Sequence, residues 1–392
     1  MERTADVVVV GAGVMGASIA FHLVDRHAGR VVVVERQFVA AGPTGRSSAA
    51  LRRHYSLELY ARMATRSLEI FRSFEELTGV PAGIRECGIL HVVGPEDLAA
   101  MRTTVATLRR IGADAEALDP LELRKLFPEM SVDGLAGGAF DRTTGYADPV
   151  AVTTGFANRA RELGAVIHQE TTVTGLTLRG GRLAAVVTDR GAIATPAVVN
   201  AAGVWAGQVA RLAGVALPIQ AARAQLAAFR IPPGFAHPLP IVGDGVRLCY
   251  FQPEVGDLVM VGPRGRSGTA AVVDPDRCDE RVDPDRVVAA AEALCHRFPV
   301  MERGSPAGGY ASMYDVTPDS HFVLERSPDV PGLFVAAGFS GHGFKHAPVI
   351  GSMMADLVLE GATREFDIEP FASRRFTDGR PPWRGSYTGI PY

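Results

Sequence analysis

The first 35 residues carry the pattern that most restricts how this chain can fold. Four consecutive valines, Val7–Val10, are typical of a short strand that is buried on both faces. They lead directly into Gly11-Ala12-Gly13-Val14-Met15-Gly16, a helical stretch to about residue 27, a second valine run at 31–34, and then Glu35. Strand, G-x-G-x-x-G loop, helix, strand and acidic residue together predict a βαβ unit that binds a dinucleotide.

The chemistry of this unit indicates which dinucleotide it takes. The N–H groups and the dipole at a helix N-terminus attract a pyrophosphate, and glycines let it approach closely. Glu35 is placed to accept hydrogen bonds from a ribose diol, and its charge would repel the 2′-phosphate of NADP. The fingerprint occurs once, and the segments 197–203 and 333–338 read as later returns to the same sheet. A cofactor contacted at the beginning, middle and end of a chain is long, which suits extended FAD better than NAD.

A second informative segment lies near the C-terminal end. It reads Gly338-Phe339-Ser340-Gly341-His342-Gly343-Phe344-Lys345 and follows the apolar strand run 333–337. Lys345 is one of two lysines in a chain that otherwise uses arginine as its cation, the other being Lys125. A cation at the start of the following helix opposes the helix dipole, so a purely structural turn leaves this lysine unexplained. We expect Lys345 to bind a substrate carboxylate; the alternative is an ordinary surface lysine.

These segments, taken together, resemble the D-amino-acid oxidase superfamily of flavoproteins, in the branch of sarcosine oxidase, sarcosine dehydrogenase and glycine oxidase. The resemblance extends to about residue 360 and rests on Gly11–Gly16 with Glu35, Gly45–Ser48, Gly145–Pro149, Asn200–Gly203 and Gly338–Lys345. It implies an FAD-dependent oxidoreductase that oxidises the C–N bond of a small secondary amine or amino acid. The implied substrates are sarcosine-like, cyclic or D-amino acids, and hydride transfer to the flavin gives an imine.

Two other functions stay open at this point. A 2-hydroxy-acid dehydrogenase would use the same scaffold, with His54 or His342 as the base for the hydroxyl proton. The chain would otherwise be the FAD-binding subunit of a larger amine dehydrogenase or oxidase complex.

The candidate catalytic residues are Lys345, Arg53, Tyr250, Tyr314 and His342. Arg53 lies nearest the substrate-binding arginine of the family, and with Lys345 it would hold a carboxylate in one orientation. A solvated arginine is the alternative for Arg53. Tyr250 resembles an active-site tyrosine of the family, although a half-buried strand residue explains it equally well, and the same holds for Tyr314. For His342, a contact with the flavin and a packed structural role remain equal alternatives.

Contacts with FAD are expected from the two glycine-rich segments and from loops between them. The expected residues are Gly11, Ala12, Gly13, Val14, Met15, Gly16, Glu35, Arg36, Arg46, Ser47, Ser48, Val173, Ala202, Gly203, Trp205, Gly338, Ser340, Gly341, His342, Gly343, Phe344 and Lys345.

The chain departs from the family pattern in two places. Sarcosine oxidase attaches FAD through a cysteine in Cys-Met-Tyr, where this chain has Ser312-Met313-Tyr314, so we expect non-covalent FAD. The family lysine that activates oxygen corresponds to Met260, and a following histidine falls near Arg264. An apolar side chain cannot stabilise developing superoxide, so the electron acceptor is either oxygen or a quinone or electron carrier.

Composition limits the remaining possibilities. The 392 residues are 47% hydrophobic and 21% charged, with a net charge of −3, which gives no reason to expect nucleic acid as a partner. No apolar run approaches the roughly 20 residues of a membrane span, and the early first strand leaves no room for a secretory signal. Four scattered cysteines without C-x-x-C spacing argue against a metal site and favour a reducing cytoplasm.

The order of the expected elements predicts a mixed α/β (α+β) fold. A discontinuous Rossmann-like FAD-binding domain would comprise residues 1–80, 145–215 and 320–370. A mainly antiparallel substrate domain would comprise residues 81–144 and 216–319, and residues 371–392 would form a tail. An antiparallel stretch is expected from 226 to 262, with a turn at Gly243-Asp244-Gly245.

Overall fold

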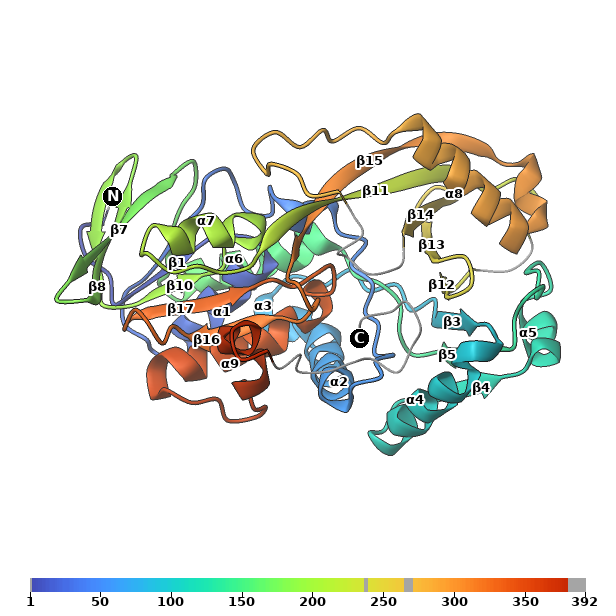
Figure 1. Ribbon diagram of the computed structural model, residues 1–392, viewed down its shortest axis with the longest axis horizontal. Coiled ribbons are helices and arrows are strands. Elements are labelled where there is room, and N and C mark those ends of the chain that lie inside the picture. Colours follow the sequence, from blue (N-terminus) through green and yellow to red (C-terminus); the bar gives the residue numbers. More distant parts are fainter. Residues whose placement is uncertain (1, 236–238, 264–270, 380–392) are drawn as a thin grey trace.

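The computed structural model describes residues 2–235, 239–263 and 271–379. One of its layers is a six-stranded sheet that contains the predicted βαβ unit (Figure 1). Its strands, in spatial order, are β16 (Val323–Arg326), β17 (Leu333–Ala337), β10 (Val198–Asn200), β1 (Val7–Val10), β2 (Val31–Val34) and β6 (Val166–His168). Five of them run parallel, and β16 pairs antiparallel with β17 at one edge.

Both faces of this sheet are covered, which explains why its central strands are uninterrupted valine runs. One face packs against α1 (Val14–Asp25), α6 (Pro149–Glu162) and α9 (Ala347–Glu360), with α2 (Glu58–Arg72) and α3 (Phe74–Thr78) beyond them. The other face packs against α7 (Ala206–Arg211) and a small antiparallel sheet. That sheet contains β7 (Val173–Arg179), β8 (Arg182–Thr188) and β9 (Gly191–Ala194).

The second large layer is an eight-stranded sheet. Its spatial order is β15 (Ser305–Val316), β11 (Gln220–Arg230), β14 (Leu258–Pro263), β13 (Cys249–Glu254), β12 (Ile241–Asp244), β3 (Ile89–Val93), β5 (Gly137–Asp141) and β4 (Ala115–Leu118). Every neighbouring pair is antiparallel except β12 and β3. The helices of this part are α4 (Leu98–Arg110), α5 (Pro120–Leu126) and α8 (Pro284–Arg297).

The long pair β11 and β15 runs from beside the parallel sheet into the eight-stranded sheet (Figure 1). The mixed α/β fold with a mainly antiparallel second sheet is therefore confirmed. The domain boundaries at residues 80, 144, 215, 319 and 370 stay a prediction.

The predicted turn at Gly243–Gly245 is wrong in its position. Gly243 and Asp244 are the last two residues of β12, and the turn follows them. The Asp244 carboxylate is fully buried and accepts a hydrogen bond from Arg297 Nε on α8, 2.8 Å away, which holds the strand end inside the protein. A buried charge requires such a partner, and the two residues are too far apart in sequence for a local pattern to predict it.

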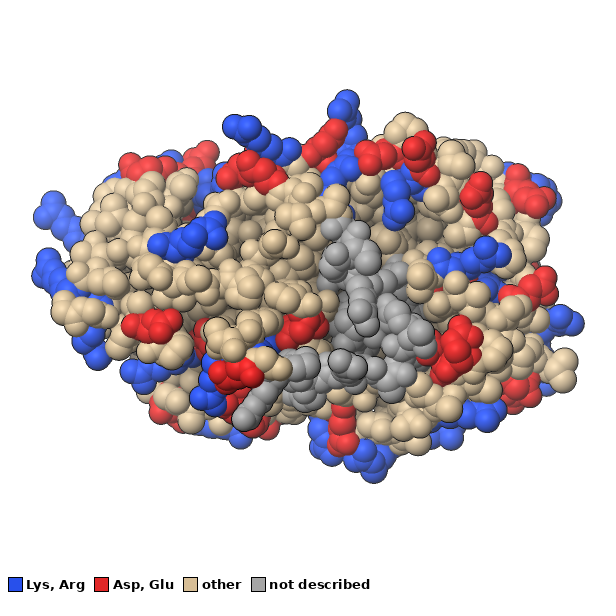
Figure 2. Space-filling model, viewed as in Figure 1, with Lys and Arg blue, Asp and Glu red and all other residues tan. Residues whose placement is uncertain are grey.

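The start of the predicted tail packs against the rest of the protein. Phe371 is fully buried, and Arg375 Nε lies 2.8 Å from Asp319 Oδ2. Within the described ranges, no helix is long and apolar enough to cross a membrane. Figure 2 shows basic and acidic side chains interspersed over the visible face, as expected from the small net charge.

Candidate functional site

A cavity of about 790 Å³ lies where the carboxyl ends of the parallel strands meet the eight-stranded sheet. Residues that follow β1, β2, β10 and β17 form one wall. Side chains of β3, β11, β12, β13 and β15 form the other. The crevice outside the carboxyl ends of the strands is where open α/β sheets bind their ligands.

The glycine loop has the backbone that its sequence predicts. Gly11 has φ +103°, and a Cβ there would lie 2.6 Å from the Ala201 carbonyl oxygen. A Cβ on Gly16 would overlap the Gly11 carbonyl oxygen, so α1 packs against the loop only because residue 16 is glycine. The loop therefore depends on both glycines for its shape.

The Glu35 carboxylate lines the cavity and braces this loop. Its Oε2 accepts a hydrogen bond from Ala12 N, and its Oε1 accepts one from Gln37 N, both at 2.8 Å. A carboxylate has about four acceptor positions, so two remain for a ribose diol. The residues present therefore fit the adenosine and pyrophosphate half of FAD.

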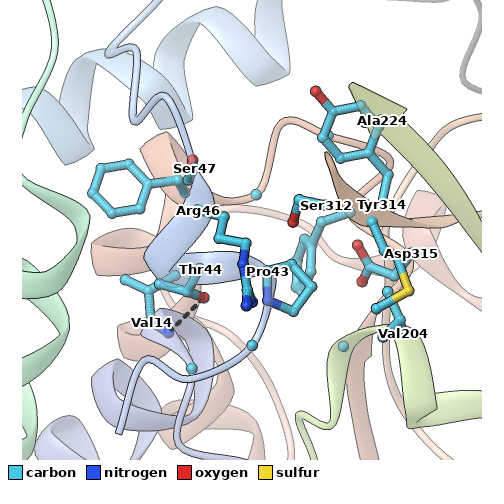
Figure 3. Close-up of a pocket in the computed structure, with 18 of the residues that line it drawn as sticks. Val14, Pro43, Thr44, Arg46, Ser47, Val204, Ala224, Ser312, Tyr314 and Asp315 are labelled. Atoms are coloured by element: carbon cyan, nitrogen blue, oxygen red, sulfur yellow. Dashed lines mark hydrogen bonds between the residues drawn. The ribbon is translucent and has the colours of Figure 1, made fainter. Parts of the chain in front are cut away.

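The segment after β2 closes the loop from the opposite side. Thr44 Oγ1 accepts a hydrogen bond from Val14 N at 3.2 Å (Figure 3). Thr44 lies in the 3₁₀ helix η1 (Pro43–Arg46). Arg46 of this helix was predicted to contact FAD, whereas Thr44 was not identified from the sequence. Ser47 Oγ accepts a hydrogen bond from Ala49 N at 3.0 Å, which makes a local serine turn, and Gln252 Nε2 donates to the Ser48 carbonyl at 2.7 Å.

Most of the predicted FAD contacts lie on the cavity wall. They are Gly11, Gly13, Val14, Met15, Glu35, Arg36, Arg46, Ser47, Ser48, Val173, Ala202, Gly203, Trp205, Ser340, Gly341, Gly343, Phe344 and Lys345. Ala12, Gly16, Gly338 and His342 are not on the wall. Gly338 has φ +72° and donates its N–H to Asp315 Oδ2 at 2.8 Å.

Lys345 is buried in the short 3₁₀ helix η6 (Phe344–His346), just before α9, and lines the cavity. Burial, and after it the positive charge of Arg52, holds the pKa of the Lys345 ammonium well below its ordinary value. Arg52 lies on the same cavity wall, with its guanidinium carbon 4.0 Å from the ring centroid of Tyr55. Arg52 Nη1 donates to the His54 carbonyl at 2.6 Å, so backbone and ring together fix its guanidinium.

The structure places Arg53, predicted as the second arm of a carboxylate clamp, away from the cavity, and its role in substrate binding stays a prediction. Arg53 is buried outside the cavity wall and binds Asp141 with two hydrogen bonds, Nε to Oδ2 at 2.9 Å and Nη2 to Oδ1 at 2.7 Å. This carboxylate already neutralises its charge. The arginine that the structure brings to the cavity beside Lys345 is its neighbour Arg52.

His342 also lies away from the cavity. Its Nε2 is 3.1 Å from the Ser320 carbonyl, and its Nδ1 is 3.5 Å from the Tyr55 hydroxyl. The same hydroxyl lies 3.2 Å from Nε2 of His346. The structure shows these packed contacts for His342, and a contact between His342 and the flavin stays a prediction.

These buried histidines should make the protein less stable as the pH falls from 6.5 to 5.5. Burial holds the pKa of His342 and His346 well below 6.5 and lowers that of His22 to about 3. Below pH 6.5 these rings bind protons only when the chain unfolds, so protonation favours the unfolded state. Asp315 acts in the opposite direction, because burial raises its pKa to about 6, and it offsets part of the loss.

We expect the free energy of unfolding to fall on the order of 2 kcal/mol over this range. Urea titrations of the FAD-loaded protein at pH 7.5, 6.5 and 5.5 would measure it. A free energy that is constant between pH 6.5 and 5.5 would show that these rings already bind protons in the folded protein.

Both predicted tyrosines line the cavity. Tyr250 lies in a row of directly paired residues across four strands, His91, Gly243, Tyr250 and Gly262. Its ring lies over Gly262, where a Cβ would overlap it, and burial raises the pKa of its hydroxyl. Tyr314 lies on β15, and a Cβ on Gly341 would come within 3.2 Å of its ring (Figure 3).

Ser312 and Met260 occupy the two places where the chain departs from the family pattern. Ser312 lines the cavity from β15, opposite Ala224 of β11 (Figure 3). Met260 is buried in a small apolar cluster with Leu226 and Ala228 that packs against Tyr250. Arg264 lies outside the described residues.

Comparisons with known proteins identify the family of this chain. Residues 6–357 match the family described as FAD dependent oxidoreductase. The chain is 29% identical over 422 residues to FAD-dependent oxidoreductase domain-containing protein 1 of Bos taurus, covering 96% of this chain and 86% of that protein. It is 28% identical over 385 residues to the peroxisomal sarcosine oxidase of Homo sapiens, covering 95% and 96%. Mitochondrial sarcosine dehydrogenase of Mus musculus is 28% identical over 391 residues, which are 96% of this chain but 42% of that protein.

Among solved structures, L-proline dehydrogenase from P. horikoshii superposes with a TM-score of 0.88 and 25% identity, covering 97% of this chain and 99% of that chain. Glycine oxidase from Geobacillus kaustophilus superposes with a TM-score of 0.82 and 25% identity, covering 95% and 99%. The family match spans most of the sequence and includes both glycine-rich segments that line the cavity. This chain therefore belongs to the family of FAD-dependent oxidoreductases.

Proposed function

We propose that this protein oxidises the C–N bond of a small secondary amine or amino acid that carries a carboxylate. The sarcosine-like, cyclic and D-amino acids are the substrates that fit this proposal. Relatives named as sarcosine oxidase and sarcosine dehydrogenase, and solved structures named as L-proline dehydrogenase and glycine oxidase, support this substrate class.

The observation that carries the proposal is the pair of cations on the cavity wall. Lys345 is buried, has Arg52 as its charged neighbour, and makes no ion pair with any of the described residues. A buried ammonium without a counter-charge is unfavourable, and a substrate carboxylate would supply that charge. Lys345 would bind the carboxylate as a point charge, and Arg52 with its planar guanidinium would fix its orientation.

The opposite wall fits the body of such a substrate. Ile89 and Ile241 are paired directly across β3 and β12, and both line the cavity. They pack with Tyr146 in one apolar cluster, and the Tyr250 ring lies on the same face of the sheet two residues further along. A compact substrate with an aliphatic or cyclic body would bury its C–H groups there, while its carboxylate binds Lys345 and Arg52.

The protein's part in the reaction is to orient the donor carbon and exclude water. Bound FAD supplies the redox chemistry by accepting a hydride from the carbon beside the nitrogen. The amine would bind in its neutral form, next to two cations that disfavour an ammonium group. The oxidised product, an imine, would then hydrolyse to an amine and a carbonyl compound.

A 2-hydroxy acid is the less favoured substrate. It needs a base for the hydroxyl proton, and neither His54 nor His342 lies on the cavity wall. His91, on β3, does line the cavity, although the sequence did not identify His91 as a site residue. The hydroxy acids therefore belong in the test as an alternative.

Anaerobic titration of the purified protein tests the function. We expect N-methyl, cyclic or D-amino acids to bleach the visible flavin band, and the extent of bleaching should saturate as the substrate concentration increases. Bleaching by 2-hydroxy acids alone would overturn the proposal, and bleaching that requires a partner protein would indicate a subunit role. Admitting air afterwards identifies the acceptor, because immediate return of the colour indicates oxygen, and return only with a quinone or carrier indicates a dehydrogenase.

We further propose that FAD is held without a covalent bond, since Ser312 offers a hydroxyl where a thioether would need a thiol. Acid precipitation should then leave the yellow flavin in the supernatant.

A cytoplasmic location is proposed as well, supported by the four cysteines, which are all unbridged thiols: Cys87, Cys249, Cys278 and Cys295.

A further inference from the structure

The loop that precedes α8 runs alongside the long strand pair β11 and β15 (Figure 1). We call its residues 274–283 the strap. Five of its ten residues are acidic: Asp274, Asp276, Asp279, Glu280 and Asp283. Its backbone is fixed to the long strand pair, because Ala311 N donates to the Glu280 carbonyl at 2.7 Å and Arg223 Nε donates to the Asp279 carbonyl at 2.9 Å.

Three acids of the strap pair with arginines of the cavity wall. Asp276 lies 2.7 Å from Arg36 Nη1, and Glu280 lies 2.7 Å from Arg46 Nη2. Asp283 binds Arg223 with both oxygens, at 2.8 Å and 3.0 Å. Arg36 follows strand β2 of the parallel sheet, whereas Arg223 lies on β11 of the eight-stranded sheet. The strap therefore connects the two sheets across the cavity.

The end of the strap at Asp276 lies beside the adenosine half of the cofactor site. Arg36 directly follows Glu35, the residue expected at the ribose diol. Trp205 Nε1 donates to Asp276 Oδ1 at 2.9 Å, and the Arg36 guanidinium carbon lies 4.7 Å from the Trp205 ring centroid. One carboxylate thus sets the position of two cavity-lining side chains.

We propose that the strap retains FAD in the cavity, and that Asp276 is a positioning residue for the adenosine end. FAD leaves when the strap separates from the arginines, so the ion pairs slow its dissociation. All three pairs are partly exposed to solvent, so each slows dissociation by a factor of only roughly two to five. They act together, because the strap clears the cavity only when all three are broken.

The test measures FAD dissociation from the loaded protein through the fluorescence of released flavin. The double variant Asp276→Asn/Glu280→Gln should release FAD about fivefold faster at 50 mM NaCl. The wild-type rate should rise when NaCl is increased to 500 mM, since salt screens exposed pairs, and the rate of the double variant should change less. Asp276→Glu keeps the charge, so its FAD dissociation rate should lie closer to the wild-type rate than that of Asp276→Asn.

Asp279→Asn is the matched control. It removes one charge from the same strap, but the Asp279 carboxylate pairs with Arg281 inside the strap rather than with the cavity wall. Its dissociation rate should equal that of the wild type. The proposal is overturned if the double variant releases FAD at the wild-type rate, or if Asp279→Asn accelerates release as much as the double variant does. Neither result would affect the proposed substrate class, which the anaerobic titration tests separately.

Discussion

Replacing Lys345 with methionine should raise the KM for a carboxylate-bearing amine about 100-fold, because it removes one partner of a buried charge pair. Methionine has nearly the same length and fills the same apolar surroundings, so the change removes the charge and little else. Arg52 would remain as the second cation and keep part of the affinity. The variant should still bind FAD, since most of the cofactor wall lies elsewhere in the cavity.

The chain offers a matched control, because Lys125 is its only other lysine and is exposed on α5. Lys125→Met should leave KM unchanged. Acetate binding can be monitored through the change it causes in the flavin spectrum, which separates affinity from turnover. The affinity for acetate should weaken by a similar factor in Lys345→Met. An unchanged acetate affinity and KM in that variant would show that the carboxylate binds elsewhere.

The features that the sequence predicts correctly depend on local patterns. The valine runs, the glycine fingerprint and Glu35 lie within 29 consecutive residues, and the backbone of that unit is nearly fixed by φ angles and close packing. Lys345 was found because lysine is rare here and its position opposes the helix dipole. Both signals can be read without knowing the tertiary structure.

The features that it missed depend on which side of a segment faces the cavity. Arg52 and Arg53 are adjacent, and only the position of Asp141 decides which of them is neutralised and which faces the cavity. His91 and Ile89 lie on strand β3, and the face they present depends on strand β12, about 150 residues later. The pairing of Arg36 with Asp276 joins residues 240 positions apart, which no local pattern could indicate.

Replacing Gly16 with alanine should weaken FAD binding about 30-fold, which corresponds to about 2 kcal/mol of overpacking. The added Cβ would overlap the Gly11 carbonyl oxygen, and that atom cannot move freely. Gly11 N donates to the Val34 carbonyl at 2.9 Å, and its own Cα packs against Ala201. Either α1 moves away from the loop or the loop moves into the cavity, and both changes alter the pyrophosphate position.

The affinity for FAD can be measured by titrating the apoprotein with FAD and monitoring the quenching of flavin fluorescence. Gly175→Ala is the matched control, because its Cβ would lie at an ordinary 3.4 Å from Val187 on the small sheet, away from the cavity wall. That variant should bind FAD as the wild type does. Wild-type affinity in Gly16→Ala would mean that the loop and α1 can separate without cost, and the close packing at Gly16 would then not be what positions the cofactor. A loss confined to Gly16→Ala would show that the close contact between α1 and the glycine loop positions the cofactor.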